Sequence, residues 1–176
     1  AHHASDHQWV TGDAESLPFK TNSIDLIYSS LAIQWCSNLT QLMQEIERVL
    51  SPGGCFVFSS LLDGTLSELK AAWSRVDDNQ HVNDFFFRKD YQQAISKTCL
   101  SIELLEEETE VLRYQKLTVL MKELKGLGAH NINNERSSGL TGKKKLSSAI
   151  SAYEKLRLKD GQLPASYQLL WGVLVI

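Results

Sequence analysis

Two kinds of hydrophobic pattern alternate in the N-terminal half of the chain. Short continuous apolar runs at 23–29 and 55–62 are typical of strands that are covered on both faces. Apolar residues at intervals of three and four predict helices over 39–50 and 65–76, and a further strand is expected at 8–10. Strands and helices that alternate with short loops predict right-handed crossovers and a parallel sheet of the α/β class.

Polar residues and glycines mark where these helices begin and end. Asn38, with Gln41 three residues later, has the pattern of an N-cap. The segment 65–68 (Thr-Leu-Ser-Glu) has the pattern of a capping box. Pro52 lacks a backbone donor and Gly53 tolerates a positive φ, so the first helix should stop before them.

The second half of the chain carries weaker patterns. Three helices are expected, at 88–100, 117–127 and 147–158. Strand character lies at 101–113 and 166–176, and a polar, glycine- and serine-rich loop lies at 130–142. We therefore expect one domain over residues 1–176, with a helical insertion at 114–160 before the last strand.

Composition narrows the possible functions. Of 176 residues, 43% are hydrophobic and 22% are charged, which is typical of a globular chain. The net charge of -3 lacks the basic excess of a general nucleic-acid binder, and the longest apolar stretch, 169–176, is too short to span a bilayer. Three widely spaced cysteines form no CxxC pair. We therefore expect no disulfide framework and no metal site, and a reducing cytoplasm as the compartment.

Three candidate ligand segments follow predicted strands, at 11–19, 29–35 and 59–65, and ligands of open parallel sheets bind beyond the carboxyl ends of the strands. For the third segment, the alternative is an ordinary loop and helix cap. Asp13 offers a carboxylate to an exocyclic amine, and the backbone beside Ala14 can read an adenine edge. The alternative is a Gly-Asp turn followed by a proline bend. Residues 29–35 mix small side chains with an aromatic one, and the large ones either line a ligand site or pack under the next helix.

Two further groups lie outside the predicted sheet. His81, Asn83 and Phe85 could bring an imidazole to a reactive centre, although a single histidine is also a common structural residue. Lys143–Lys145 fall in the first turn of a helix that Thr141 would cap, where each cation opposes the helix dipole by about 0.3–1 kcal/mol. That placement suggests an anionic partner, and the alternative is a solvated face. No GxGxxG, P-loop, HExxH or GxSxG motif is present.

Several of these segments resemble a known enzyme family. GDAESLPF, SIDLIYSSLAIQW, ERVLSPGGCFVFSSL and LKGLGAHN are similar to class I S-adenosylmethionine-dependent methyltransferases. SSLAIQWCSNL, DGTLSELKAAWSRVDDNQHVNDF and GLTGKKKL extend the similarity to the malonyl-acyl-carrier-protein O-methyltransferases of biotin synthesis. The resemblance runs from about residue 6 to residue 176.

The resemblance implies a Rossmann-like fold and a reaction. S-adenosyl-L-methionine would methylate the free carboxylate of a malonyl thioester carried on acyl carrier protein. The residues that it places at the cofactor are Asp13, Ala14, Ser29, Ser30 and Leu31. Those that it places at the transfer site are Trp35, His81 and Asn83, with Gln34 and Phe85 at the substrate. Arg136, Lys143, Lys144 and Lys145 are the candidates for phosphopantetheine or the acidic carrier protein.

The chain departs from the family pattern at its start. Family members begin with a strand and a glycine-rich loop that wraps the methionine portion, whereas this sequence starts at the third strand. We therefore expect an N-terminally truncated sheet, weak cofactor binding, and an exposed edge that could pair with a second copy. The alternatives are a methyltransferase of another small metabolite, or a non-catalytic interaction module whose partner completes the sheet.

Overall fold

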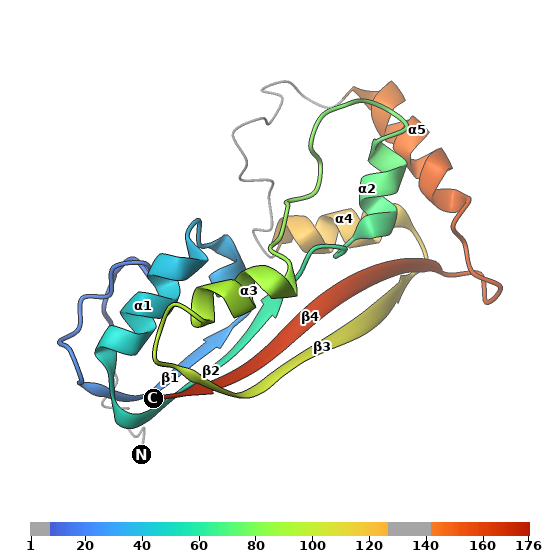
Figure 1. Cartoon of the computed structure of the whole chain (residues 1–176). Coiled ribbons are helices and arrows are strands. Elements are labelled where there is room, and N and C mark those ends of the chain that lie inside the picture. The colour runs from blue at the N-terminus through green and yellow to red at the C-terminus, as the bar shows by residue number, and fades with distance from the viewer. Residues whose placement is uncertain (1–7, 127–141) are drawn as a thin grey trace, which may run out of the picture. The chain divides into compact units, whose positions relative to one another are not determined.

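The structure is a computed structural model, and it describes residues 8–126 and 142–176. Within them, four strands form a sheet in the order β1-β2-β4-β3 (Figure 1). The strands are β1 (Ile24–Ser30), β2 (Leu50–Leu61), β3 (Ser101–Tyr114) and β4 (Leu163–Val175). The helices are the 3-10 turn η1 (Ile33–Trp35), α1 (Leu39–Val49), α2 (Ser67–Trp73), α3 (Arg88–Ile95), α4 (Leu117–Gly126) and α5 (Lys143–Glu154). No described helix is both long and apolar enough to cross a membrane.

The chain divides into two compact units. The first combines the N-terminal residues up to Ser59 with Lys89–Leu105 and Trp171–Ile176. The second combines Ser60–Arg88 with Glu106–Leu170, and so contains α2, α4 and α5. The helices α4 and α5 fall between β3 and β4 in the chain, where the sequence predicts a helical insertion.

The sheet is mixed. β1 runs parallel to β2, with Ile27 opposite Phe56 and Ser30 opposite Ser59, as the alternating pattern predicts. β4 runs antiparallel to β2, because Gly53 N donates to Ile176 O at 3.2 Å and Ile176 N donates back to Gly54 O at 3.2 Å. The parallel sheet expected from the first half of the chain therefore holds for β1 and β2, and the last strand reverses direction.

The core of the first unit lies between α1, α3 and the sheet. The predicted cap of α1 is confirmed, since Gln41 N donates to Asn38 Oδ1 at 3.1 Å. On the sheet, Phe58 stacks between Phe56 and Tyr91, with ring centroids 4.9 Å and 6.1 Å away. The buried residues of α1 are those of its predicted apolar face: Leu39, Leu42, Met43, Ile46 and Val49.

The core of the second unit joins α2, α4 and α5 to the ends of β3 and β4. Trp73, Tyr114 and Tyr153 are its largest buried side chains, and Tyr153 Oη donates to Pro164 O at 2.6 Å. Burial raises the pKa of the Tyr114 and Tyr153 hydroxyls above the ordinary value. The other buried members are Leu66, Leu69, Ala72, Val82, Leu117, Leu120, Ala149, Ala152, Leu163 and Ala165.

Two expectations about the first strands are wrong. Residues 8–10 form no strand, and Trp9 is 92% exposed. A strand needs a hydrogen-bonding neighbour, and no described strand pairs with these residues. β1 is not covered on both faces either, because Leu26 and Tyr28 are 61% and 71% exposed. β1 is an edge strand of the described sheet. The face that carries Leu26 and Tyr28 is left largely uncovered by the described residues, although the continuous apolar run predicts burial.

The predicted capping box at 65–68 is also wrong. Leu66 precedes α2 in the left-handed region, and no side chain caps the helix. Thr65 and Glu68 bind β4 instead: Gln168 N donates to Thr65 Oγ1 at 3.0 Å, and Ser166 N donates to Glu68 Oε2 at 3.1 Å. These long-range bonds compete with the local cap and replace it. Two other helix boundaries differ from the prediction: α3 ends at Ile95 rather than at 100, and α5 spans Lys143–Glu154 rather than 147–158.

Gly172 is predicted to be required for the packing of Phe58. A Cβ at this position would lie 2.2 Å from Phe58 Cε1, and Phe58 is almost fully buried. Gly172→Ala should therefore lower the free energy of unfolding by about 1–3 kcal/mol, as measured by urea denaturation. Gly126→Ala is the control, because a Cβ there would meet no described atom within 4 Å beyond its chain neighbours and its own helix backbone, and a helical Gly→Ala change is neutral or favourable. Equal losses in both variants would contradict the steric argument.

Candidate functional site

Small polar groups line the carboxyl end of the parallel pair β1–β2. Ser30, the last residue of β1, lies opposite Ser59, and the two hydroxyl oxygens are 3.5 Å apart. Leu31 N donates to Ser59 O at 3.0 Å and approaches Ser59 Oγ at 3.3 Å. Small side chains at this rim allow a ligand to approach the backbone closely.

Leu31 has an unusual backbone conformation just after β1. Its φ of 48° lies in the left-handed region, which few non-glycine residues adopt. Gln34 Nε2 donates to Leu31 O at 2.7 Å and helps to hold the turn. Strained residues of this kind concentrate at binding sites, so the conformation supports this rim as a functional site.

The segment 13–16 forms a tight turn in the same unit. Ser16 N donates to Asp13 O at 3.0 Å, and Glu15 N donates to Asp13 Oδ1 at 2.9 Å. The turn reading proposed as the alternative for Asp13 is therefore correct as local structure. It does not exclude a ligand, because Asp13 Oδ2 has no hydrogen-bond donor among the residues that the structure describes.

Glu15 anchors this turn to the start of α1. Its carboxylate accepts hydrogen bonds from Asn38 N at 2.9 Å, from Ser37 N and from Ser37 Oγ at 3.1 Å. Gln41 Nε2 donates back to Glu15 O at 2.9 Å. A carboxylate at a helix N-terminus meets unpaired backbone donors and the positive end of the dipole. The sequence analysis missed Glu15, because its partners lie 22 and 23 residues away.

Cys36 links η1 to the acidic turn. Burial raises the pKa of the Cys36 thiol to about 11, and the charges of Glu15 and Asp13 add to the effect. The two carboxylates therefore lie close enough to act on the sulfur. Trp35, the residue before it, is 38% exposed, and Gln34 is buried.

The two groups of predicted residues could hold different parts of a cofactor: the Asp13 turn the adenine, and the residues after β1 the methionine end. Asp13 Oδ2 can accept a hydrogen bond from an exocyclic amine, and the hydroxyls of Ser30 and Ser59 stand beside the strained turn at Leu31. Asp13, Ala14, Ser29, Ser30 and Leu31, the five predicted cofactor residues, all lie in the first unit. The turn is joined to the segment that follows η1 by the hydrogen bonds that Ser37 N and Asn38 N donate to Glu15.

A second group of predicted site residues lies in the other unit. His81 Nε2 is 2.7 Å from Asp77 Oδ1, and its ring stacks on Trp73 with centroids 3.8 Å apart and planes 13° from parallel. Lys145 Nζ donates to Asp77 Oδ2 at 2.7 Å. Hydrogen bonds from Lys145, then from His81, hold the pKa of Asp77 well below its usual range.

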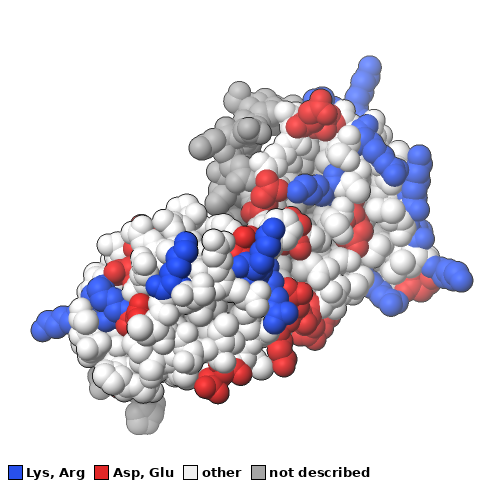
Figure 2. Space-filling model, viewed as in Figure 1, with Lys and Arg blue, Asp and Glu red and all other residues white. Residues whose placement is uncertain are grey.

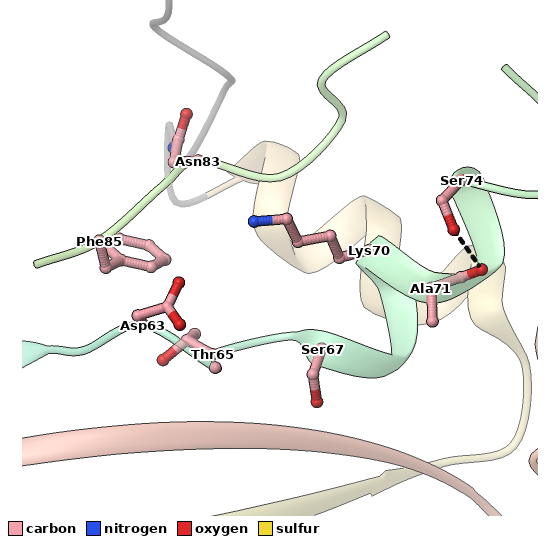
Figure 3. A pocket seen from close by; sticks show the side chains of 9 residues that line it. Asp63, Thr65, Ser67, Lys70, Ala71, Ser74, Asn83 and Phe85 are labelled. Atoms are coloured by element: carbon pink, nitrogen blue, oxygen red, sulfur yellow. Dashed lines mark hydrogen bonds between the residues drawn. The ribbon is translucent and has the colours of Figure 1, made fainter. Parts of the chain in front are cut away.

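Asn83, which the resemblance places at the transfer site, and Phe85, which it places at the substrate, line one open cavity. The cavity has a volume of about 320 Å³ and also contains Lys70 (Figure 3). Lys70 Nζ donates to Asp84 Oδ1 at 2.8 Å, and that hydrogen bond raises the pKa of Lys70. The sequence analysis did not single out Lys70. The remaining lining residues are Asp63, Gly64, Thr65, Ser67, Ala71 and Ser74.

The predicted basic group is only partly described. Arg136 and Thr141 lie outside the described residues, and so does the side chain of Lys143. Gly142 precedes α5 and makes no side-chain cap. Lys144 is exposed, while Lys145 is engaged with Asp77. Lysine and arginine side chains gather over α5 and the turn that follows it (Figure 2).

Comparisons with known proteins agree with the resemblance. A family described as a methyltransferase domain matches residues 1–58. The malonyl-[acyl-carrier protein] O-methyltransferase of Hahella chejuensis is 42% identical over 170 residues, which is 96% of this chain and 60% of that protein. The corresponding protein of Nitrosospira multiformis is 37% identical and is covered to 53%. The chain is related to the malonyl-[acyl-carrier protein] O-methyltransferases.

A longer relative shows the same similarity. The biotin biosynthesis bifunctional protein BioHC of Cellvibrio japonicus is 48% identical over 98% of this chain and 34% of its own length. The chain thus spans between about a third and two thirds of the relatives that it matches.

Solved structures confirm the predicted fold class. A Bacillus halodurans protein described as a methyltransferase superposes with a TM-score of 0.62 at 14% identity, over 97% of this chain and 73% of its own. The YcgJ protein of Bacillus subtilis gives 0.57 at 20% identity, over 93% and 68%. The described sheet with its helices therefore has the Rossmann-like fold of class I methyltransferases.

Removing the charge of Glu15 is predicted to loosen the turn from α1. Glu15→Gln should lower the free energy of unfolding by about 1 kcal/mol, because the helix loses a charged acceptor at its N-terminus. Glu103→Gln, an exposed glutamate in the same unit, should change it by less than about 0.5 kcal/mol. Thermal or urea unfolding measures both. No difference between the variants would contradict the anchoring role.

Cys36 is predicted to react slowly with alkylating reagents below pH 10. A thiol of pKa about 11 is ionised in only about one molecule in a thousand at pH 8, and the thiolate is the reactive form. Alkylation by iodoacetamide, followed by peptide mass spectrometry, should therefore rise steeply between pH 9 and pH 11. Glu15→Gln should shift the rise to lower pH. A plateau already near pH 9 in the unchanged protein would contradict the prediction.

Proposed function

We propose that this chain forms part of an S-adenosyl-L-methionine-dependent methyltransferase. The substrate would be the free carboxylate of malonyl-acyl carrier protein, in the synthesis of biotin. The observation that carries the proposal is the similarity to proteins of that name over 96% of the chain. An ester at this position would hide a charge and let fatty-acid enzymes extend the chain as if it were apolar.

The extent of the similarity favours this substrate over another small metabolite. The methyltransferase domain family ends its match at residue 58, near the end of the first unit's N-terminal part. The named relatives match through α2, the 77–85 segment and the α4–α5 region as well. These segments contain the cavity and the basic residues. An enzyme that acts on a different substrate would have no need to keep them similar in sequence.

In this proposal, the first unit binds the cofactor. Asp13 would accept a hydrogen bond from the adenine amine, with Ala14 beside the ring. Ser29, Ser30 and Leu31 would lie at the methionine end. The cofactor would supply a methyl group bound to a positively charged sulfur. Asp13 Oδ2, which has no donor among residues 8–126 and 142–176, and the strained turn at Leu31 support this assignment.

The reaction requires positioning more than proton transfer. A carboxylate is ionised at neutral pH, so the substrate oxygen is already a nucleophile and needs no general base. The chain must hold that oxygen in line with the methyl carbon and exclude water. Trp35, His81 and Asn83 remain the predicted transfer-site residues, with Gln34 and Phe85 at the substrate. Because Asp77 occupies His81 Nε2, we assign His81 an orienting role.

The second unit would receive the carrier protein. The helices within 114–160 would act as a cap that presents cations to an acidic partner and to phosphopantetheine. Of the four predicted cations, Lys144 is the one that has an exposed side chain and no partner among the described residues. Cations at the edge of an interface mainly speed encounter and fix orientation. Such a partner also places the reaction in the cytoplasm.

A second candidate rests on the open edge of β1. Leu26 and Tyr28 are largely exposed on a strand that lacks a second neighbour in the described sheet. Such an edge would accept a strand from another chain, as in a homodimer or in an interaction module completed by its partner.

The direct test of the proposed function is transfer of a labelled methyl group. The assay would combine S-adenosylmethionine labelled in its methyl group, malonyl-acyl carrier protein, and the protein that contains this 176-residue chain. Label on the carrier protein, released by mild alkaline hydrolysis of the ester, is the expected result. Transfer to a small metabolite alone would favour the rival methyltransferase. No cofactor binding, together with dimers in light scattering, would favour the interaction module.

Lys144 is predicted to assist docking of the carrier protein. Lys144→Glu should lower kcat/KM for malonyl-acyl carrier protein roughly 2- to 5-fold at low salt, since a rim charge acts on the association rate. It should leave a short malonyl thioester unaffected, and the loss should shrink at high salt. Lys20→Glu, an exposed lysine of the first unit, is the matched control. Equal losses on both substrates would remove the docking role.

A further inference from the structure

Asp77 is a largely buried carboxylate with three partners. Its side chain is 12% exposed. Lys145 Nζ donates to Oδ2 at 2.7 Å, His81 Nε2 lies 2.7 Å from Oδ1, and Asn79 N donates to Oδ1 at 3.2 Å. A carboxylate removed from water is tolerated when its oxygens are paired in this way, and losing the pairing is costly. The Asp77 carboxylate therefore holds Lys145, His81 and the backbone of Asn79 in place, and these three contacts in turn hold the carboxylate.

The contact with Asp77 determines which histidine nitrogen carries a proton. An ionised carboxylate is an acceptor only, so His81 Nε2 must be protonated in this geometry. The ring is held a second time, because it stacks on Trp73 with centroids 3.8 Å apart. Two contacts at different sites of the ring prevent it from turning. The His81 ring is thus held in one orientation, against Trp73 of α2 on its face and against Asp77 at Nε2.

The same contacts join two helices to one wall of the substrate cavity. Trp73 is the last residue of α2, and Lys145 belongs to the first turn of α5. Val82, next to His81, is buried in the core of the unit. Asn83 follows it and lines the cavity with Phe85 (Figure 3). The position of this wall therefore depends on Asp77, six residues before Asn83, in addition to the hydrogen bonds that Lys70 and Gln80 donate to Asp84.

We propose that Asp77 is a positioning residue that sets the cavity wall carrying Asn83 and Phe85, by holding His81 and Lys145 at the same time. The nature of the ligand, an acyl thioester, rests on the proposed function. The positioning itself rests on the contacts alone. Lys145 is accordingly a structural cation that Asp77 engages.

Nuclear magnetic resonance tests the positioning without any need for activity. In the unchanged protein, long-range ¹H–¹⁵N spectra at pH 8 should show His81 as the Nε2-protonated tautomer. Asp77→Asn should abolish that single tautomer and shift the side-chain amide signals of Asn83. Asp78→Asn, which removes an exposed carboxylate at the adjacent position, should change neither. An unchanged His81 spectrum in Asp77→Asn, or unmoved Asn83 signals, would overturn the proposal.

Kinetics separate positioning from a general loss of structure. Asp77→Asn should raise KM for malonyl-acyl carrier protein about 10-fold with kcat within 2-fold, and Asp77→Glu should restore part of the loss. A fall in kcat alone, or equal effects of Asp77→Asn and Asp78→Asn, would overturn the proposal. If the unchanged protein transfers no methyl group, the proposed function fails, and the spectra still decide the positioning role.

A second variant keeps the test valid if Asp77→Asn does not fold. Lys145→Gln removes the lysine charge that pairs with Asp77, and the fold should tolerate the change because the Lys145 side chain is 49% exposed. The signals of both His81 and Asn83 should shift in this variant, because the Asp77 carboxylate loses its contact with the lysine ammonium. Unmoved signals would show that Asp77 does not couple the two helices to the wall.

Discussion

Parallel pairing of β1 with β2 is the constraint on which the candidate cofactor site depends. It brings the ends of two strands to one rim, where Ser30 lies opposite Ser59 and the chain turns sharply at Leu31. The same pairing requires a crossover, and α1 supplies it with a face buried from Leu39 to Val49. Because α1 starts beside the rim, Glu15 can reach its first backbone donors and bring the Asp13 turn to the same place. One strand pairing thus determines where four separate segments meet.

The sequence predicted the elements of the first unit because their signals are local. Asn38 and Gln41 cap α1 as their spacing indicates, and Gly53 adopts the positive φ expected after the helix. The predictions failed where a distant partner overrides the local pattern. Thr65 and Glu68 have the spacing of a capping box, yet they bind Gln168 and Ser166 on β4. A bond to residues about 100 positions away leaves no trace in a local window.

The candidate site divides in the same way. Asp13 and the residues after β1 were singled out from their place behind predicted strands, which is a local argument; of those two strands only β1 forms, and the roles of these residues stay predictions. Glu15 and Lys70 were missed, because their roles depend on Asn38 and Asp84, which folding brings to them. Asp77 is an intermediate case. It lies only four residues from His81, so this contact is local, although 77–81 forms no helix, and the link to Lys145 needed the structure.

Charge in the second unit bears on how a carboxylate substrate could react there. Lys70 is the cation of the cavity, and it is already bound to Asp84 and under the influence of Asp63. Lys145 is likewise bound to Asp77. If the proposed malonyl carboxylate binds here, a lysine without an acidic partner would pair with it tightly and draw electron density from the oxygen that attacks the methyl group. A lysine that is already paired with an aspartate attracts an incoming anion more weakly than an unpaired lysine does, because the aspartate offsets part of its charge. Such partial neutralisation suits a nucleophile that has to leave its ion pair to form the new bond.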